Sequence, residues 1–214
     1  MKNLNEYRKN YFSQNGEDGV LLEIFDRIGI DVTSSNKNNF CVELGAWDGK
    51  KYSNTFSLVK NNNWKTLYIE GDSLKFKELQ KTALEYKNIN PVLAYIEADK
   101  DSKNSLNNIL SINSFPLDFE ILSIDIDSFD LAIWESFSDY KPKVVVIEIN
   151  SSFLPGVLFW NSPGTQGNSF SSTLKVAESK NYTLVCHTGN MIFVRKDLVG
   201  KIKLEDRFYK YPEL

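Results

Sequence analysis

Residues 40–49, with the sequence FCVELGAWDG, constrain the fold of this chain more than any other segment. The segment begins with an apolar run, carries one carboxylate at Glu43, and ends in two glycines, Gly45 and Gly49. A helix can begin just after it, near Ser53. This order is typical of a buried strand, a tight glycine turn and a helix N-terminus, which together hold a nucleotide-like cofactor over the end of a parallel sheet.

The carboxylate inside the predicted strand indicates which cofactor would suit the turn. An ionised group buried in a strand is costly unless a partner pairs with it. A cationic cofactor tail would be such a partner for Glu43, and S-adenosylmethionine (SAM) carries both a sulfonium and an ammonium. We therefore predict a SAM-binding turn with contacts from the following residues: Glu43, Gly45, Ala46, Asp48 and Gly49.

Hydrophobic periodicity predicts alternating strands and helices. Helical spacing occurs over 17–29, 53–60, 73–87, 102–110, 129–138 and 169–180, with Ser53 and Ser73 as N-caps. Shorter apolar runs predict strands over 39–45, 65–70, 91–97, 119–125, 143–149, 182–187 and 191–195. We predict an α/β fold with a mostly parallel seven-stranded sheet, helices on both faces and a C-terminal antiparallel hairpin. The 214 residues fit one domain, 1–214, that opens with a helical segment over 1–38.

Several short motifs occur in an order that resembles one family. They are YFSQNGED (11–18), VELGAWDG (42–49), SNT (53–55), LYIEGD (67–72), ILSIDIDSFD (121–130), VVVIEIN (144–150) and FVRKDL (193–198). The ordered set resembles the FkbM-like methyltransferases of sugar and polysaccharide pathways, over roughly residues 11–198. The resemblance implies a Rossmann-like class I methyltransferase fold, SAM as the donor, and a hydroxyl acceptor, often on a sugar. The family pattern often has Gly where this chain has Ser128.

Further cofactor contacts follow from the strand ends. Glu70, followed by Gly71, closes a predicted strand, where a carboxylate can accept hydrogen bonds from both ribose hydroxyls. The alternative for Glu70 is an ordinary exposed acid. By the resemblance, Asp99 or Glu97 would lie near the adenine amino group, unless it is a solvated turn residue.

The segment before the first predicted strand adds one more contact. By the resemblance, Gln14 would reach the methionine end of the cofactor. Asn54 and Thr55 would begin a helix that faces the same pocket. Glu17 and Asp18 are either part of this site or acids favoured by the dipole of a helix N-terminus.

Carboxylates also gather at the ends of the fourth and fifth predicted strands. In a parallel sheet these ends share one edge, and like charges crowded there need a cationic partner, such as SAM, a divalent cation or both. Asp125, Asp127, Glu148 and Asn150 offer oxygen ligands that could hold Mg²⁺. The alternative is that the acids bind the SAM amino group, while Asp130 caps the helix over 129–138.

A general base would have to take the proton of an acceptor hydroxyl. His187 is the only histidine, and it ends the predicted strand over 182–187. Its alternative role is that of a hairpin-end residue exposed to water. Asp125, Asp127 and Glu148 are the other catalytic candidates, acting directly or through a metal.

The segment 151–168 interrupts the alternation with prolines, glycines and large apolar residues. Its length and its aromatic residues, Phe153, Phe159 and Trp160, predict a lid or sugar-stacking wall at the acceptor pocket. An irregular packing loop or a dimer contact is the alternative. Trp47, inside the glycine turn, would face ligand or fill core.

Composition and charge indicate which kind of molecule this protein binds. The net charge is −3 and the pI about 5.4, without the basic excess typical of nucleic-acid binding, so we expect a small-molecule or glycan substrate. The N-terminus lacks a hydrophobic signal region, and no apolar run has the length of a membrane span, so we expect a cytoplasmic protein. Cys41 and Cys186 are expected to be buried thiols.

Three functions are compatible with some of these features. The leading interpretation is a SAM-dependent O-methyltransferase acting on a sugar or polysaccharide-precursor hydroxyl. A non-catalytic module of the same fold that binds SAM or a nucleotide is the alternative. A dinucleotide oxidoreductase is disfavoured because the turn has the sequence GAWDG instead of GxGxxG.

Overall fold

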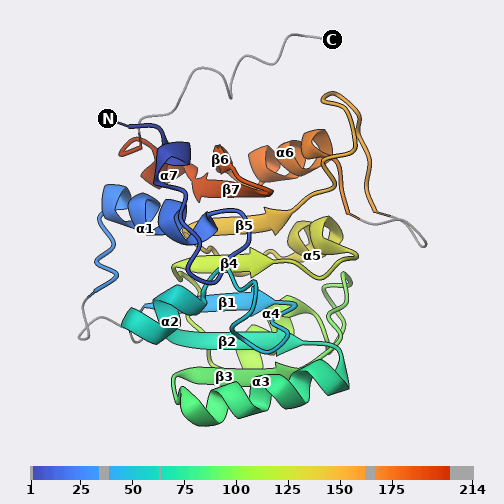
Figure 1. Cartoon of the computed structure of the whole chain (residues 1–214). Helices are drawn as coiled ribbons and strands as arrows, with labels where there is room; N and C mark the ends of the chain where they lie inside the picture. The colour runs from blue at the N-terminus through green and yellow to red at the C-terminus, as the bar shows by residue number, and fades with distance from the viewer. Residues whose placement is uncertain (1, 34–38, 63, 162–166, 203–214) are drawn as a thin grey trace.

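The structure, a computed structural model, describes residues 2–33, 39–62, 64–161 and 167–202. Its centre is a seven-stranded sheet with the order β3-β2-β1-β4-β5-β7-β6 (Figure 1). The strands are β1 (Phe40–Leu44), β2 (Lys65–Glu70), β3 (Ile89–Leu93), β4 (Ile121–Ile124), β5 (Val144–Glu148), β6 (Tyr182–His187) and β7 (Asn190–Arg195). β1 to β5 pair in parallel, whereas β7 is antiparallel to both β5 and β6. The predicted sheet and its closing hairpin are confirmed.

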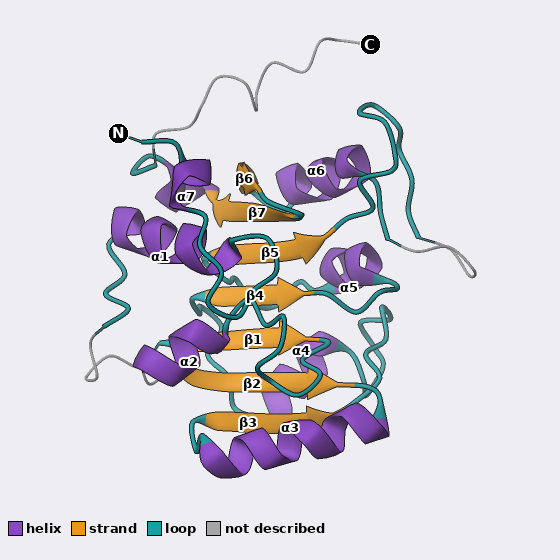
Figure 2. Cartoon of the chain, in the orientation of Figure 1, coloured by secondary structure: helices purple, strands orange, loops and turns teal. Residues whose placement is uncertain are grey.

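Helices cover both faces of the sheet (Figure 2). α1 (Glu17–Ile28), α2 (Phe56–Asn62) and α3 (Ser73–Glu85) pack on one face, and α4 (Leu106–Ile112), α5 (Asp130–Ser136) and α6 (Phe170–Ser179) pack on the other. The 3-10 helix η1 (Leu4–Tyr7) and the short helix α7 (Lys196–Val199) are additional elements that the sequence pattern does not predict. Within the described part of the chain, no helix combines the length and apolar character that a membrane crossing needs.

The sheet separates two apolar cores. Residues 144–147 of β5 alternate between them, and all four side chains are buried, as expected for a strand covered on both faces. The core under α4, α5 and α6 contains the buried Trp134, and the core under α1, α2 and α3 contains the buried Trp64. Cys41 and Cys186 are both buried thiols.

β3 is displaced from its predicted position. It covers Ile89–Leu93 instead of 91–97, because β2 ends at Glu70, whose partner on β3 is Leu93. Beyond Leu93, β2 has no further residue for β3 to pair with. Glu97 and Asp99 therefore lie in the following loop, and their expected position at a strand end is wrong.

Three helix starts also differ from the prediction, and one of them is α2, which begins at Phe56 instead of 53. Asp72, not Ser73, caps α3, because its Oδ1 accepts two first-turn amides at 2.7 and 3.0 Å. α4 begins at Leu106 with Ser105 as its N-cap, later than the predicted position 102. Ser53 keeps its predicted capping contact, since its Oγ accepts the first amide of α2 at 2.9 Å.

Candidate functional site

A cavity of about 680 Å³ opens at the carboxyl ends of β1, β2, β4 and β5, the edge at which α/β sheets bind ligands. Nine of the predicted site residues line it: Gln14, Glu43, Gly45, Ala46, Glu70, Gly71, Asp125, Asp127 and Glu148. The remaining predictions do not reach its lining: Asp48, Gly49, Asn54, Thr55, Asp99, Asn150 and His187. The structure thus gathers the acids of four strand ends around one space.

The glycine turn after β1 is pressed against the end of β4. Gly45 has φ +74°, and a Cβ on it would lie 1.8 Å from the backbone oxygen of Asp125. The amides of Gly45 and Ala46 both donate to the carbonyl of Ile69, which ties the turn to β2. Only glycine allows this close approach, so the turn itself forms one wall of the cavity.

Asp48 and Gly49 shape the same turn without lining the cavity. Asp48 Oδ1 accepts the amides of Lys50 and Lys51 at 2.8 and 2.7 Å. A Cβ on Gly49 would lie 2.7 Å from the side chain of Leu79, so this glycine allows the turn to pack on α3. Both residues therefore act within the turn and towards α3.

Glu43 is held by the chain itself. Its carboxylate accepts hydrogen bonds from the Ser53 hydroxyl at 2.7 Å, the Asn54 amide at 3.1 Å, and both the amide and the hydroxyl of Thr55. Burial raises the pKa of Glu43 to about 7, and these hydrogen bonds act in the opposite direction. The residues just before α2 thus satisfy this acid, which also lines the cavity, and its contact with a cofactor stays a prediction. Asn54 and Thr55 serve Glu43 instead of facing the cavity.

Glu70 links two turns at the cavity wall. Its Oε2 accepts the Trp47 amide at 2.8 Å, and its Oε1 accepts the Asp72 amide at 2.8 Å. The residue is buried and lines the cavity. An ionised carboxylate has about four acceptor positions, so two remain for a ligand diol.

Three carboxylates meet at the ends of β4 and β5. Oxygens of Asp125, Asp127 and Glu148 lie within 4.8 Å of one another. Burial, and then the charge of the neighbouring acids, raises the pKa of both Asp125 and Glu148, and a hydrogen bond joins their carboxyl groups. Both carboxyl groups therefore hold a proton more readily than an ordinary acid does. Asp127 is exposed and takes the left-handed conformation, with φ +56°.

Asp130 and Asn150 have other partners than expected. Asp130 accepts the amides of Ile126 at 2.8 Å and Ser128 at 3.1 Å, so it holds the β4–α5 loop and is not the N-cap of α5. Burial raises its pKa. Asn150 Oδ1 accepts the Ser152 amide at 2.9 Å. Of the four predicted metal ligands, the three carboxylates lie together.

Two buried acids fold the N-terminal segment onto the site. One oxygen of Asp18 accepts the amides of Tyr11, Phe12 and Ser13 at 2.8 to 2.9 Å, and this places the next residue, Gln14, in the cavity wall. Both acids stand at the start of α1, as a helix dipole favours. Their hydrogen bonds, however, go back to the preceding segment, and this role is absent from the sequence expectation.

Glu17 connects the same segment to the β6–β7 hairpin. Its Oε2 accepts the Asn15 amide at 2.8 Å. Its Oε1 accepts the Thr188 hydroxyl at 2.6 Å and the Asn190 side chain at 3.5 Å. The N-terminal segment is thereby attached to the last two strands of the sheet.

His187 lies away from the cavity. Its ring packs against Phe170, and Arg8 donates to its backbone oxygen at 2.7 Å. Burial and then the charge of Arg8 lower its pKa. His187 ends β6, the edge strand, which β7 separates from β5. His187 is half-buried, so the alternative of full exposure to water is wrong, whereas its role as a base stays a prediction.

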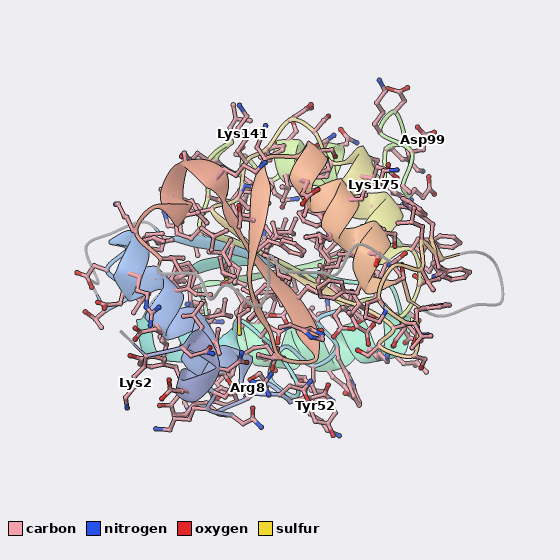
Figure 3. The ribbon with its side chains drawn as sticks, turned by 90° about the horizontal axis from the view of Figure 1, so that it is seen from above. Lys2, Arg8, Tyr52, Asp99, Lys141 and Lys175 are labelled. Carbon is pink, nitrogen blue, oxygen red and sulfur yellow. The ribbon has the colours of Figure 1, made fainter. Side chains whose placement is uncertain are left out.

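Asp99 is exposed on a loop outside the cavity. In Figure 3 it projects from the opposite side of the molecule to Tyr52, which lines the cavity. Its Oδ1 accepts the Asp101 amide at 3.0 Å. Tyr95 and Ile96 line the cavity where Asp99 is expected, because β3 ends earlier than predicted.

The segment 151–161 is held against the N-terminus of α6, and residues 162–166 of the predicted loop lie outside the described residues. Phe153 stacks on Phe159 at 4.5 Å, and Trp160 packs against the core. Asn161 donates to the backbone oxygen of Ser128, which lines the cavity. The segment thus adjoins the cavity edge, whereas its aromatic rings are engaged within the protein.

A cationic and aromatic group lies on the β1–β2 side of the cavity, and sequence reasoning misses all of it except Trp47, which lines the cavity as one of its two expected roles requires. Lys51 Nζ lies 4.8 Å from the Trp47 ring and 4.9 Å from the Tyr52 ring, and Lys75 Nζ lies 5.2 Å from the Trp47 ring. All four line the cavity with Tyr95. They stand in turns and at helix starts without periodicity, so only the left-handed turn geometry brings them together.

Comparisons with known proteins bear on the fold. No protein-family model and no curated protein matches the chain. Among solved structures, the METTL16 MTase domain is 13% identical with a TM-score of 0.53, over 83% of this chain and 66% of that one. The CurJ carbon methyltransferase is 10% identical with a TM-score of 0.52, over 83% and 52%. The N-terminal domain of EvdMO1, determined with S-adenosylhomocysteine (SAH) and D-fucose present, is 12% identical with a TM-score of 0.51, over 85% and 82%. The chain has the Rossmann-like fold of class I methyltransferases.

Proposed function

We propose that this chain is a SAM-dependent methyltransferase that transfers a methyl group to a hydroxyl of a sugar or polysaccharide precursor. The observation that carries the proposal is the cavity at the sheet edge, where the glycine turn meets Glu70 on one side and the Asp125–Glu148 pair on the other. The likeness of fold to methyltransferases and the ordered FkbM-like motifs support the same function.

The residues of the cavity fit SAM by their chemistry. The volume of about 680 Å³ lies within the usual range for small-ligand sites. Glu70 has acceptor positions left for the ribose hydroxyls, and Ile69 and Ile96 supply apolar surface for a purine. Asp125 and Asp127 would face the cationic end, and Gln14 can donate to a carboxylate.

Bound SAM would supply the methyl group, which an oxygen nucleophile takes by in-line displacement at the sulfonium. The chain contributes alignment, because the rigid turn and the β4–α5 loop fix the walls on both sides of the reacting atoms. The Asp125–Glu148 pair would then accept the hydroxyl proton, since burial raises the pKa of both carboxyl groups towards neutrality.

Asp125, Asp127 and Glu148 also have the oxygen chemistry that Mg²⁺ prefers. A bound cation there would favour the ionised form of these carboxylates and lower the pKa of the acceptor hydroxyl. The net charge of −3 and the six carboxylates in the lining favour a small-molecule or glycan acceptor over a nucleic acid.

Calorimetric titration of SAM into the protein, with and without Mg²⁺, tests the cofactor. We expect micromolar binding that Glu70→Gln weakens by about tenfold or more, because a charge-assisted pair with the ribose is lost. Asp99→Asn, which changes an exposed acid outside the cavity, should bind as the wild type does. Absence of SAM binding to the wild-type protein would refute the proposal.

A second measurement separates the enzyme from the non-catalytic module. SAH formation is followed with a panel of free and nucleotide-linked sugars, and with RNA as a contrasting acceptor. Turnover with a sugar supports the proposal, and stimulation by Mg²⁺ would assign the acid cluster to a metal. SAM binding without SAH formation from any acceptor would favour the binding module.

A further inference from the structure

The segment after β5 differs in composition from the rest of the chain. Residues 149–174 contain no Asp, Glu, Lys or Arg, although these residues make up 25% of the whole sequence. Within this stretch, Leu154, Val157 and Leu158 are 75%, 41% and 53% exposed. Single exposed apolar residues are common, but three within five residues of an uncharged loop form a patch.

This patch, Leu154, Val157 and Leu158, stands on a well-defined turn. The amide of Val157 donates to the Leu154 oxygen at 3.2 Å, and Gly156 has φ +91°, as in a type II turn with Pro155 before the glycine. A backbone hydrogen bond therefore closes the turn, and the aliphatic side chains of the turn are exposed.

Serines at the start of α6 hold the segment in place. Ser169 Oγ donates to the Val157 oxygen at 2.6 Å and accepts the Phe159 amide at 3.0 Å. Ser172 Oγ donates to the Phe159 oxygen at 2.6 Å, and Ser171 Oγ accepts the Gly156 amide at 2.8 Å. With its polar backbone groups satisfied in this way, the segment exposes apolar side chains without exposing unpaired backbone.

The patch belongs to the same edge of the molecule as the cavity. Asn161 at the end of the segment donates to Ser128, and Ser128 lines the cavity beside Asp127. Figure 1 shows the segment, in yellow to orange, projecting beside α6 at the side where β1, β2 and β4 end. This hydrogen bond thus links an acidic cavity end to the uncharged segment that carries the apolar patch.

We infer that the acceptor is amphiphilic, with a polar head at Asp125 and Glu148 and an apolar chain lying along Leu154, Val157 and Leu158. This inference rests on the proposed methyltransferase function and names the substrate class of the same site. An uncharged chain matches a surface without charged side chains, and a hydroxyl-bearing head matches the carboxyl pair.

Chain-length dependence of binding tests the inference. The probes are methyl β-D-glucoside and n-octyl β-D-glucoside, titrated below the micelle concentration into the protein saturated with SAH. We expect the octyl probe to bind at least about tenfold more tightly, since burial of only two methylenes corresponds to that factor. Equal affinities, or no binding of either probe, would overturn the inference.

Serine variants locate the effect. The triple variant L154S/V157S/L158S should lose the chain-length dependence, while its SAM affinity stays that of the wild type. The matched control L84S/I112S changes two aliphatic residues that are 70% and 73% exposed elsewhere, on α3 and α4, and should keep the dependence. A chain-length effect that survives the triple variant would show that the apolar chain lies elsewhere and would overturn the inference.

The SAM titration keeps the two proposals apart. SAM binding together with chain-independent probe binding would contradict the amphiphilic acceptor and leave the methyltransferase standing, whereas absent SAM binding contradicts the methyltransferase itself. Co-sedimentation with neutral phosphatidylcholine vesicles tests whether the patch binds a lipid surface instead. Vesicle binding that is lost in the triple variant, without any preference for the octyl probe, would assign the patch to a lipid surface and overturn the inference.

Discussion

Gly45 is the residue at which the backbone leaves no space for a side chain. We predict that Gly45→Ala lowers the free energy of unfolding by about 3 kcal/mol or more, because φ is +74° and the new Cβ would lie 1.8 Å from the Asp125 oxygen. Gly200→Ala is the matched control, since φ there is −58° and no atom lies within 4 Å of an added Cβ. It should change the urea unfolding energy by less than about 0.5 kcal/mol. Similar stability of the two variants would contradict the packed turn.

The Asp125–Glu148 pair determines the expected pH dependence of turnover. Because burial and neighbouring acids raise the pKa of both groups, SAH formation should rise with pH above the ordinary carboxyl range of about 4. We predict that Asp125→Asn lowers kcat by about 10²-fold or more and flattens this profile. The measurement is kcat against pH for wild type and variant. A variant that keeps the wild-type profile would exclude the pair as the base.

His187 affects stability, and we predict that it leaves catalysis almost unchanged. Its folded pKa is lowered from 6.5, so the unfolded chain takes up the proton first, and stability is lost as the pH falls below about 6.5. His187→Gln should remove part of this acid-induced loss, measured by urea unfolding at about pH 7.5 and about pH 5.5. Loss of a general base lowers turnover by about 10²- to 10⁴-fold, and we expect SAH formation in His187→Gln to fall by far less. A fall of that size would restore His187 as the base.

At the scale of elements, the start of α1 positions the segment that carries Gln14. We predict that Asp18→Asn weakens SAM binding by about tenfold, because the three amides of residues 11–13 lose their charged acceptor. Gln14→Ala should cause a similar loss, and the double variant no further one, since both act through the same contact. Asp26→Asn, on the exposed side of α1, is the control and should bind normally. Additive losses in the double variant would show that Asp18 does not act through Gln14.

The elements differ in how far the sequence predicts them. β2 and β6 have the predicted boundaries, and β5 is found within its apolar run, because these strands alternate or remain apolar without interruption. β3 does not have its predicted boundaries, because the end of its pairing with β2 sets its last residue, Leu93, and its composition does not. A strand with Asn90 and Pro91 in its middle has little local signal of its own.

The site follows the same division. Acids at strand ends are predicted correctly where strand boundaries are, as for Glu70, Asp125 and Glu148. The hydrogen-bond partners of the acids are not predicted, because Glu43, for example, accepts hydrogen bonds from residues ten to twelve positions later in the chain. The lysines and tyrosines of the β1–β2 side depend on positive φ angles at Trp47 and Tyr52, which periodicity does not indicate.

At the scale of the whole molecule, two cores share one sheet. We predict that they unfold together, because residues 144–147 of β5 supply side chains to both and neither helical layer is covered without the sheet. Replacing the other three tryptophans by phenylalanine leaves either Trp64 or Trp134 as a fluorescence reporter of one core. The two urea transitions should coincide. An earlier transition at Trp64 would show that the α1–α2–α3 layer is a separate cooperative unit.

The strand order also has a consequence for how the protein is made. β7 is the last of the described strands along the chain, yet it lies between β5 and β6. While the ribosome is still producing the final part of the chain, β5 has no neighbour on that side, and its valine-rich backbone edge is open to pairing with another nascent chain. β7 covers this edge of β5, so a chain released before residue 190 would leave that edge unpaired.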